Sequence, residues 1–96
     1  ELVPPSGVYA TFATVDGVVY PAITNIGLRP TFGDVEHPVI ETHLLDIDRD
    51  LYGAHVRLSF VQRLRDERAF ADVDALRAQI DADCRAARRL FGRISL

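Results

Sequence analysis

The sequence predicts a mainly β fold of four antiparallel strands with one helix at the C-terminal end. β-Branched and aromatic residues dominate the first half of the chain, as is typical of strands. An Asp-Gly pair between two such runs predicts a tight hairpin turn. Near Asp72 the spacing of apolar residues changes from about two to about 3.6, which indicates a helix. A chain of 96 residues fits one domain with a single core.

The first two predicted strands form a hairpin. They cover residues 8–15 and 18–26, which are rich in Val, Ile, Thr and aromatic residues, and Asp16-Gly17 is the turn between them. Pro21 cannot donate a backbone hydrogen bond. We therefore expect the second strand to lie at an edge or to carry a bulge near Tyr20.

A loop and two more strands are predicted after the hairpin. Residues 27–38 contain two glycines and two prolines, and a loop of about a dozen residues in a compact domain is usually functional or mobile. The third strand is predicted at residues 39–45. In the fourth, Val56, Leu58 and Phe60 alternate with polar residues, which predicts a strand with one buried face.

The C-terminal segment predicts an amphipathic helix. Asp72 is a suitable N-cap, Asp74 suits the positive end of the helix dipole, and Gly92 follows the last turn. Apolar residues recur along one face at helical spacing. They are Val73, Leu76, Ile80, Ala87 and Phe91.

The composition excludes several function classes. The chain has no Lys, so all 11 basic residues are Arg. P-loop enzymes, protein kinases and Schiff-base enzymes each need a lysine at a fixed point and are excluded. A net charge of −3 with 8% aromatic residues argues against a nucleic-acid binder. The absence of Met suggests a piece of a longer reading frame.

Metal binding, disulfides and membrane insertion are not predicted. The single Cys84 cannot form an internal disulfide, and the three histidines show no metal-ligand spacing with it. Asp46, Asp48 and Asp50 resemble the start of a calcium loop, but the required Gly and Glu are absent, so a solvated turn is favoured. No apolar run approaches the ~20 residues needed to span a membrane, and no secretion signal is present. We expect a cytoplasmic protein.

Glu41 is the candidate catalytic residue. It lies on a predicted strand directly after the long loop. A rigid strand fixes the direction of a carboxylate while a neighbouring loop can close over a substrate, which suits a general base. Taken alone, this position is better explained by an ordinary exposed strand residue.

Five motifs in series make the chain similar to a known family. They are Gly7-Val8-Tyr9-Ala10, residues 25–32, residues 41–46, Leu51-Tyr52-Gly53, and residues 64–67 with Phe70. In this order and spacing they resemble the riboflavin kinase domain, which in bacteria is usually the C-terminal half of a bifunctional riboflavin kinase/FAD synthetase. The resemblance covers nearly the whole of residues 1–96.

The resemblance implies a fold, a reaction and a set of site residues. Family members transfer the γ-phosphoryl group of ATP to the 5′-hydroxyl of riboflavin, giving FMN and ADP, on a small antiparallel β-barrel with an external helix. The residue matching Glu41 is their catalytic base, and a carboxylate with Mg²⁺ can suffice without lysine. The residues expected near riboflavin are Arg65, Phe70, Val73 and Asp74, with Gly27, Pro30, Thr31 and Phe32 bordering the cleft. Helix-start and turn roles account for these residues equally well.

The chain departs from the family at its N-terminal side. The family's nucleotide loop and Pro-Thr-Ala-Asn motif, which hold magnesium and the ATP phosphates, do not occur in the 96 residues. We therefore expect a partial barrel, without the nucleotide-binding strand and loop, that is weakly active or inactive alone. An adenylyltransferase domain is a possible neighbour in the parent chain. The alternatives are a non-catalytic flavin-binding or partner-docking barrel and an oligonucleotide-binding barrel.

Overall fold

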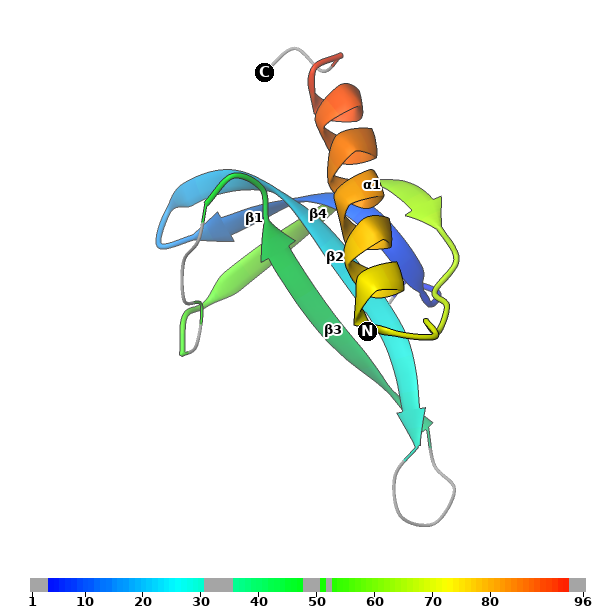
Figure 1. The fold of residues 1–96 in the computed structure, drawn as a ribbon. Coiled ribbons are helices and arrows are strands. Elements are labelled where there is room, and N and C mark those ends of the chain that lie inside the picture. Colours follow the sequence, from blue (N-terminus) through cyan, green and yellow to red (C-terminus); the bar gives the residue numbers. More distant parts are fainter. Residues whose placement is uncertain (1–3, 31–35, 48–50, 52, 94–96) are drawn as a thin grey trace.

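Four antiparallel strands form one curled sheet, and one helix packs against its outer side (Figure 1). The structure, a computed structural model, describes residues 4–30, 36–47, 51 and 53–93. The elements are β1 (Gly7–Val15), β2 (Val18–Pro30), β3 (Glu36–Leu44), β4 (Val56–Arg65) and α1 (Val73–Phe91). The predicted mainly β class with a C-terminal helix is confirmed.

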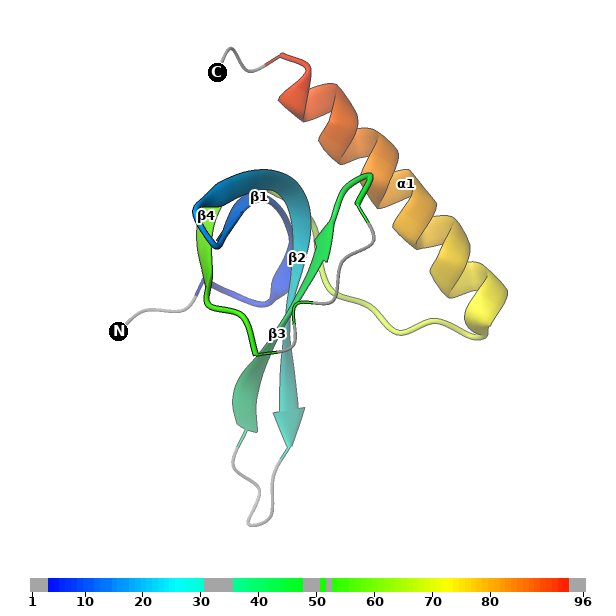
Figure 2. The ribbon, with the colours of Figure 1, turned by 90° about the vertical axis from the view of Figure 1, so that its left-hand side faces the viewer.

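The strand order is β3-β2-β1-β4, so β1 and β2 are central and β3 and β4 are the edges of this sheet. The sheet curls strongly, and Figure 2 shows β4, β1 and β2 bending around a common interior with α1 outside. The sheet therefore has a concave inner face and an outer face directed toward α1.

The hairpin between β1 and β2 is confirmed. Val15 pairs with Val18, and the two turn residues Asp16 and Gly17 have φ of 50° and 81°. A two-residue hairpin turn needs this left-handed geometry, which Asp tolerates and Gly adopts freely.

Pro21 does not mark an edge strand, because β2 is central, and the pairing of β1 with β2 runs without a register shift past Tyr20. The carbonyl of Pro21 accepts a hydrogen bond from the backbone N–H of Leu45 at 2.9 Å. In a strand the N–H and C=O of one residue face the same neighbour. The missing donor of Pro21 therefore faces the end of β3, and the β1 ladder loses nothing.

The prediction of a loop over residues 27–38 is wrong at both ends. β2 continues to Pro30 and β3 already begins at Glu36, with Leu28 paired to Pro38. Proline is tolerated at a strand end and on an edge strand, where no ladder donor is needed, and these prolines occupy such positions. Residues 31–35 lie outside the described residues.

The expected buried face of β4 is only partly covered. Val56 is 36% exposed and Phe60 37% exposed, although Phe60 makes an edge-to-face contact with Tyr9 at 5.2 Å between ring centroids. The reason is that β4 is an edge of the sheet in the described part of the chain.

The inner face of the sheet carries a row of hydroxyl groups. Thr24 Oγ1 lies 2.9 Å from Thr11 Oγ1 and 3.1 Å from Thr42 Oγ1, which joins β1, β2 and β3. Thr11 and Thr24 are completely buried. A slip of one residue would turn these hydroxyls outward and every outer side chain inward, so this row specifies the register of β3.

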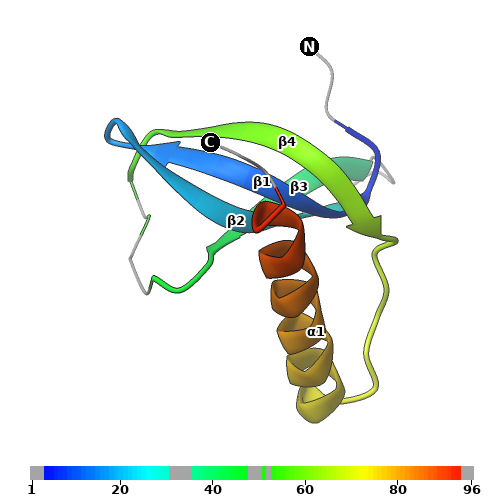
Figure 3. The same cartoon turned by 90° about the horizontal axis from the view of Figure 1, so that it is seen from above.

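The helix packs on the outer face mainly through its C-terminal half. Cys84 and Ala87 join Val8, Ile23 and Leu45 in one apolar cluster. The other end of α1 projects away from the sheet (Figure 3). Asp72 is the N-cap, as predicted, and its side chain accepts a hydrogen bond from the backbone N–H of Ala75 at 2.8 Å.

Candidate functional site

A cleft of about 540 Å³ opens on the outer face, between β2, β3 and the first half of α1. Its remaining wall comes from residues 66–71, which join β4 to α1 and are called here the connecting segment. The size is within the usual range for small-molecule sites. The residues that line the cleft are Val8, Ile23, Asn25, Arg29, Glu41, Thr42, His43, Arg65, Glu67, Arg68, Phe70, Leu76, Ile80 and Asp83.

Glu41 lies in this cleft, on β3 directly opposite Asn25 of β2. Glu41 is exposed to solvent, whereas the side chain of the next residue, Thr42, points inward to the hydroxyl row. His43, two residues further along, returns to the outer face opposite Ile23. The pleat of β3 therefore presents a carboxylate and an imidazole on one wall.

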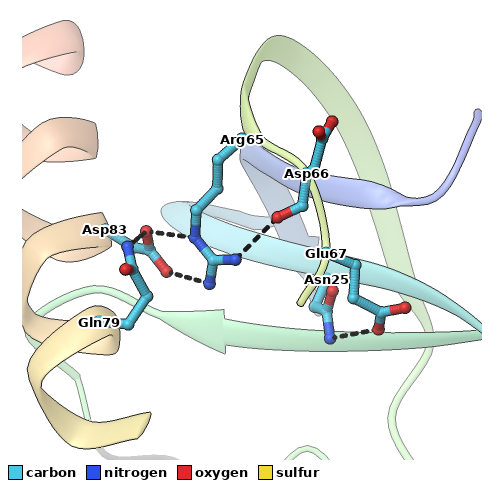
Figure 4. A network of polar contacts seen from close by, with 6 residues as sticks. All are labelled: Asn25, Arg65, Asp66, Glu67, Gln79 and Asp83. Carbon is cyan, nitrogen blue, oxygen red and sulfur yellow. Dashed lines mark hydrogen bonds and ion pairs between the residues drawn. The ribbon is translucent and has the colours of Figure 1, made fainter. Parts of the chain in front are cut away.

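Glu67 connects the opposite wall to β2. Its Oε2 accepts from Asn25 Nδ2 and from Arg29 Nη1, each at 3.4 Å. The Oδ1 of Asn25 is buried and has no hydrogen-bond partner in the described part of the chain. Figure 4 shows Asn25 and Glu67 reaching toward each other from β2 and the connecting segment.

Gly27 lies between Asn25 and Arg29 on β2. It is on the same outer face as these two residues, because side chains alternate along a strand. A Cβ atom at this position would collide with the carboxylate of Glu67 and with Nη1 of Arg29. Gly27 thus leaves the space into which Glu67 fits.

Arg65, the last residue of β4, is held by Asp83 of α1. Its Nε and Nη2 atoms donate to the two carboxylate oxygens at 2.8 Å each, and Gln79 Nε2 donates to Asp83 Oδ1 at 2.9 Å (Figure 4). The side chain of Asp83 is only 7% exposed. Paired, bidentate geometry of this kind fixes both partners in orientation. Arg65 also donates through Nη1 to the backbone carbonyl of Asp66 at 2.9 Å.

Phe70 supplies an aromatic ring to the connecting segment's side of the cleft. The guanidinium carbon of Arg68 lies 5.0 Å from the ring centroid, and that of Arg65 lies 5.9 Å away. These distances are in the cation–π range. Leu76 and Ile80, which are 40% and 39% exposed, continue the apolar surface along α1.

The predicted site residues are only partly brought together. Glu41, Arg65 and Phe70 all line the cleft. Gly27 contacts Glu67 rather than forming a loop at the cleft border, and Pro30 ends β2. Thr31 and Phe32 lie outside the described residues. Val73, which is 60% exposed, and Asp74 in the first helical turn are absent from the described lining of the cleft.

Cleft residues to which the sequence assigned no role in the site include Asn25, Glu67, Leu76 and Ile80. Strand alternation could have placed Asn25 on the outer face, and helical spacing did place Leu76 and Ile80 on one stripe. Glu67 belongs to the family motif at residues 64–67, but no local pattern indicates its contact with Asn25, which spans 42 residues of sequence.

Two other features of the described residues lie outside the cleft. A second, more open hollow of about 530 Å³ lies at the hairpin tip, between Thr14, Asp16, Gly17 and residues 55–57. Burial raises the pKa of the Cys84 thiol, which favours its protonated form over the nucleophilic thiolate.

The described residues contain no group of three or more His, Cys, Asp or Glu side chains that could hold a metal ion. Within the same residues, no helix has the length and apolar character needed to cross a membrane.

Comparison with known proteins decides the family. A family model described as Flavokinase, riboflavin kinase, matches residues 1–91. The chain belongs to the riboflavin kinase family. Relatives of this riboflavin kinase domain include the bifunctional riboflavin kinase/FMN adenylyltransferases of Bacillus subtilis, 41% identical over 97% of this chain, and of Pseudomonas fluorescens, 43% identical over 92%. The chain spans 30% and 28% of these two relatives.

Two further relatives extend the comparison. The RNA-binding riboflavin kinase RibR of Bacillus subtilis is 33% identical over 95% of the chain, which covers 40% of that protein. A solved structure from Streptococcus pneumoniae, described as a macrolide-efflux protein, is 32% identical with a TM-score of 0.83. It matches 91% of this chain and 28% of its own. The family fold is therefore shared over most of the chain.

Proposed function

We propose that this chain supplies the flavin site and the catalytic base of a riboflavin kinase, which transfers the γ-phosphoryl group of ATP to the 5′-hydroxyl of riboflavin to give FMN. The observation that carries the proposal is the position of Glu41, on a rigid strand and inside a cleft of small-molecule size. The match of residues 1–91 to the riboflavin kinase family supports the same reaction.

The chemistry of each wall suits one part of riboflavin. Phe70, Leu76 and Ile80 offer an apolar and aromatic surface for the isoalloxazine ring. Glu41 lies across the cleft on β3, where its carboxylate can accept the proton of the ribityl 5′-hydroxyl and orient that oxygen toward phosphorus. Phosphoryl transfer depends mainly on such positioning.

We assign the binding of ATP and magnesium to residues other than those that the structure describes. Among the described residues, no three His, Cys, Asp or Glu side chains are grouped as metal ligands. The family's Pro-Thr-Ala-Asn motif does not occur in the 96 residues. We therefore expect the 96-residue chain alone to phosphorylate riboflavin slowly or not at all.

The remaining assignments follow from the family. We propose a cytoplasmic protein whose ligands are riboflavin, FMN, ATP and ADP, with an adenylyltransferase domain in the parent chain as in the bifunctional relatives. With a net charge of −3, we expect no RNA binding by this chain.

The experiment is ATP-dependent FMN formation by the full-length gene product and its Glu41→Gln variant. The variant should lose at least about a hundredfold in kcat, the usual size of a general-base contribution. It should still bind riboflavin, as measured by quenching of riboflavin fluorescence. Glu36→Gln is the matched control, because Glu36 is an exposed glutamate on the same strand outside the described lining of the cleft. Full FMN formation by Glu41→Gln would remove the base assignment. Riboflavin binding without phosphorylation by the wild type would favour a non-catalytic flavin-binding module.

A further inference from the structure

The connecting segment has neither helix nor strand, yet three of its residues line the cleft, Glu67, Arg68 and Phe70. Arg65 fixes the point where the segment leaves β4, and the N-cap Asp72 fixes the point where it enters α1. Between these ends, the contacts of Glu67 join the segment to β2. The position of the segment over the cleft therefore depends on where Glu67 lies.

The outer face of β2 is shaped to receive this carboxylate. Asn25 and Arg29 flank the docking position and donate to the same oxygen, Oε2. Gly27 lies between them and provides the space, since a Cβ atom would overlap Glu67. Gly27 pairs with Val39 in a regular ladder, so the close approach of the paired Glu67 and Arg29 side chains, and not a turn, accounts for glycine here.

We propose that Glu67 is a positioning residue of the flavin site: seated over Gly27 between Asn25 and Arg29, it holds the connecting segment on β2 and thereby places Phe70 and Arg68 against the ligand. The inference rests on the proposed function for the identity of that ligand as riboflavin. Glu67 itself need not touch the flavin.

The geometry predicts a contact that matters for binding and little for folding. Both hydrogen bonds are long, at 3.4 Å, and the side chains of Glu67 and Arg29 are 28% and 46% exposed. Exposed pairs of this kind add little to global stability. Local opening of a segment, however, follows the strength of its own few contacts. Loss of Glu67 should therefore open the connecting segment without unfolding the domain.

The first test uses the full-length gene product and trypsin, with no ligand present. Cleavage after Arg68 reports opening of the connecting segment. In Glu67→Ala this cleavage should become about tenfold faster, because it follows the population of the open form. Glu67→Gln keeps an acceptor oxygen and should remain closer to wild type. Wild-type cleavage in Glu67→Ala would overturn the proposal.

Asp66→Ala is the matched control. Asp66 is the neighbouring carboxylate on the same segment, but it pairs with Arg63 at 2.7 Å and its side chain is 86% exposed. The charge change is the same and the contacts to β2 are kept. This variant should match wild type in trypsin cleavage and in riboflavin kinetics, and an effect equal to that of Glu67→Ala would count against a specific role of Glu67.

The second test measures riboflavin and ATP kinetics separately. Glu67→Ala should raise KM for riboflavin about tenfold and leave kcat and KM for ATP within about twofold, since binding of the flavin is affected and the chemistry is not. A fall in kcat with unchanged riboflavin KM would contradict a positioning role at the flavin end.

A double variant tests the space over Gly27. Gly27→Ala displaces Glu67 and its partner Arg29, and should therefore reproduce the Glu67→Ala changes in cleavage and KM. In the double variant the two changes should not add, because they remove one contact. Additive losses would mean that Gly27 acts independently of Glu67. If wild type bound no riboflavin, the proposed function would fail, while the ligand-free cleavage result would still decide the role of Glu67.

Discussion

Two sets of contacts hold the chain near the connecting segment, and they differ sharply in hydrogen-bond length and in burial. At one end, Arg65 and Asp83 form a bidentate pair at 2.8 Å, with Asp83 nearly buried and further held by Gln79. At the other, Glu67 makes two contacts of 3.4 Å to partly exposed partners. Figure 4 shows the Arg65–Asp83 pair and the Asn25–Glu67 contact in one view. The first attachment fixes the sheet to the helix, and the second sets how closely the segment lies on β2.

This difference assigns separate tasks to residues that are near neighbours in sequence. A buried, fully paired carboxylate is costly to disturb, because removing its partner leaves a charge without compensation. A long, exposed contact is easily made and broken. The cleft therefore has a rigid wall at Arg65 and an adjustable wall at Glu67.

The largest expected effect comes from breaking the rigid attachment. Arg65→Ala leaves the carboxylate of Asp83 buried and unpaired, and should lower the free energy of unfolding by about 3–5 kcal/mol. Urea denaturation followed by circular dichroism measures this. Arg88→Ala is the control. Arg88 of α1 forms another Arg–Asp pair, with Asp46, which follows β3 in sequence. The side chains of this pair are 47% and 68% exposed. If both variants lost equal stability, burial would not distinguish the attachments.

A smaller loss of stability is expected beneath the cleft. Thr24→Val removes the central hydroxyl of the inner row and leaves those of Thr11 and Thr42 without this partner, at a cost of about 1–3 kcal/mol. Thr14→Val, on β1 near the hairpin tip, should change stability much less. Thermal denaturation measures both. A wild-type melting temperature for Thr24→Val would show that the row does not hold β3 in register.

The adjustable wall should affect binding rather than folding. Phe70→Ala removes the aromatic surface at the cleft and should raise the Kd for riboflavin about tenfold, which corresponds to about 1.4 kcal/mol. Riboflavin fluorescence quenching measures this Kd. Ala69→Ser changes the exposed neighbouring residue and should bind as wild type does. Unchanged affinity in Phe70→Ala would exclude the connecting segment from the flavin site.

The smallest effect concerns the exposed pair and pH. The hydrogen bond from Arg88 lowers the pKa of Asp46. A lowered folded-state pKa stabilises the folded state above the usual aspartate pKa of about 3.9, and this contribution is lost as the pH falls through the lowered value. The difference in urea midpoint between wild type and Arg88→Ala should therefore be small at pH 6 and should shrink as the pH falls below the usual aspartate pKa. A difference in urea midpoint that grew as the pH fell would contradict a lowered pKa of Asp46 in the folded state.

Local signals predicted much of this fold from the sequence. The Asp16-Gly17 turn requires left-handed backbone angles that few other pairs supply, and Asp72 caps a helix through its own side chain. Glu41 was placed on a strand by the apolar pattern around it. Each of these predictions depends on residues within a few positions of one another.

Predictions that depended on sheet order were less successful. Pro21 was expected at an edge or bulge, and residues 27–38 were read as loop, because the positions of proline in a sheet depend on which side of the strand has a neighbour. The docking of Glu67 on β2 and of Arg65 on Asp83 joins residues 42 and 18 positions apart. No local pattern encodes such pairs, so the adjustable wall of the cleft emerges only from the folded chain.

The most direct test of the central claim is where riboflavin binds. ¹⁵N-labelled full-length protein titrated with riboflavin would report this through backbone amide shifts. We predict that the largest shifts fall on the cleft, at Asn25, Glu41 and Phe70. Shifts confined to the hollow at the hairpin tip, around Gly17 and Arg57, with an unperturbed cleft, would contradict the account.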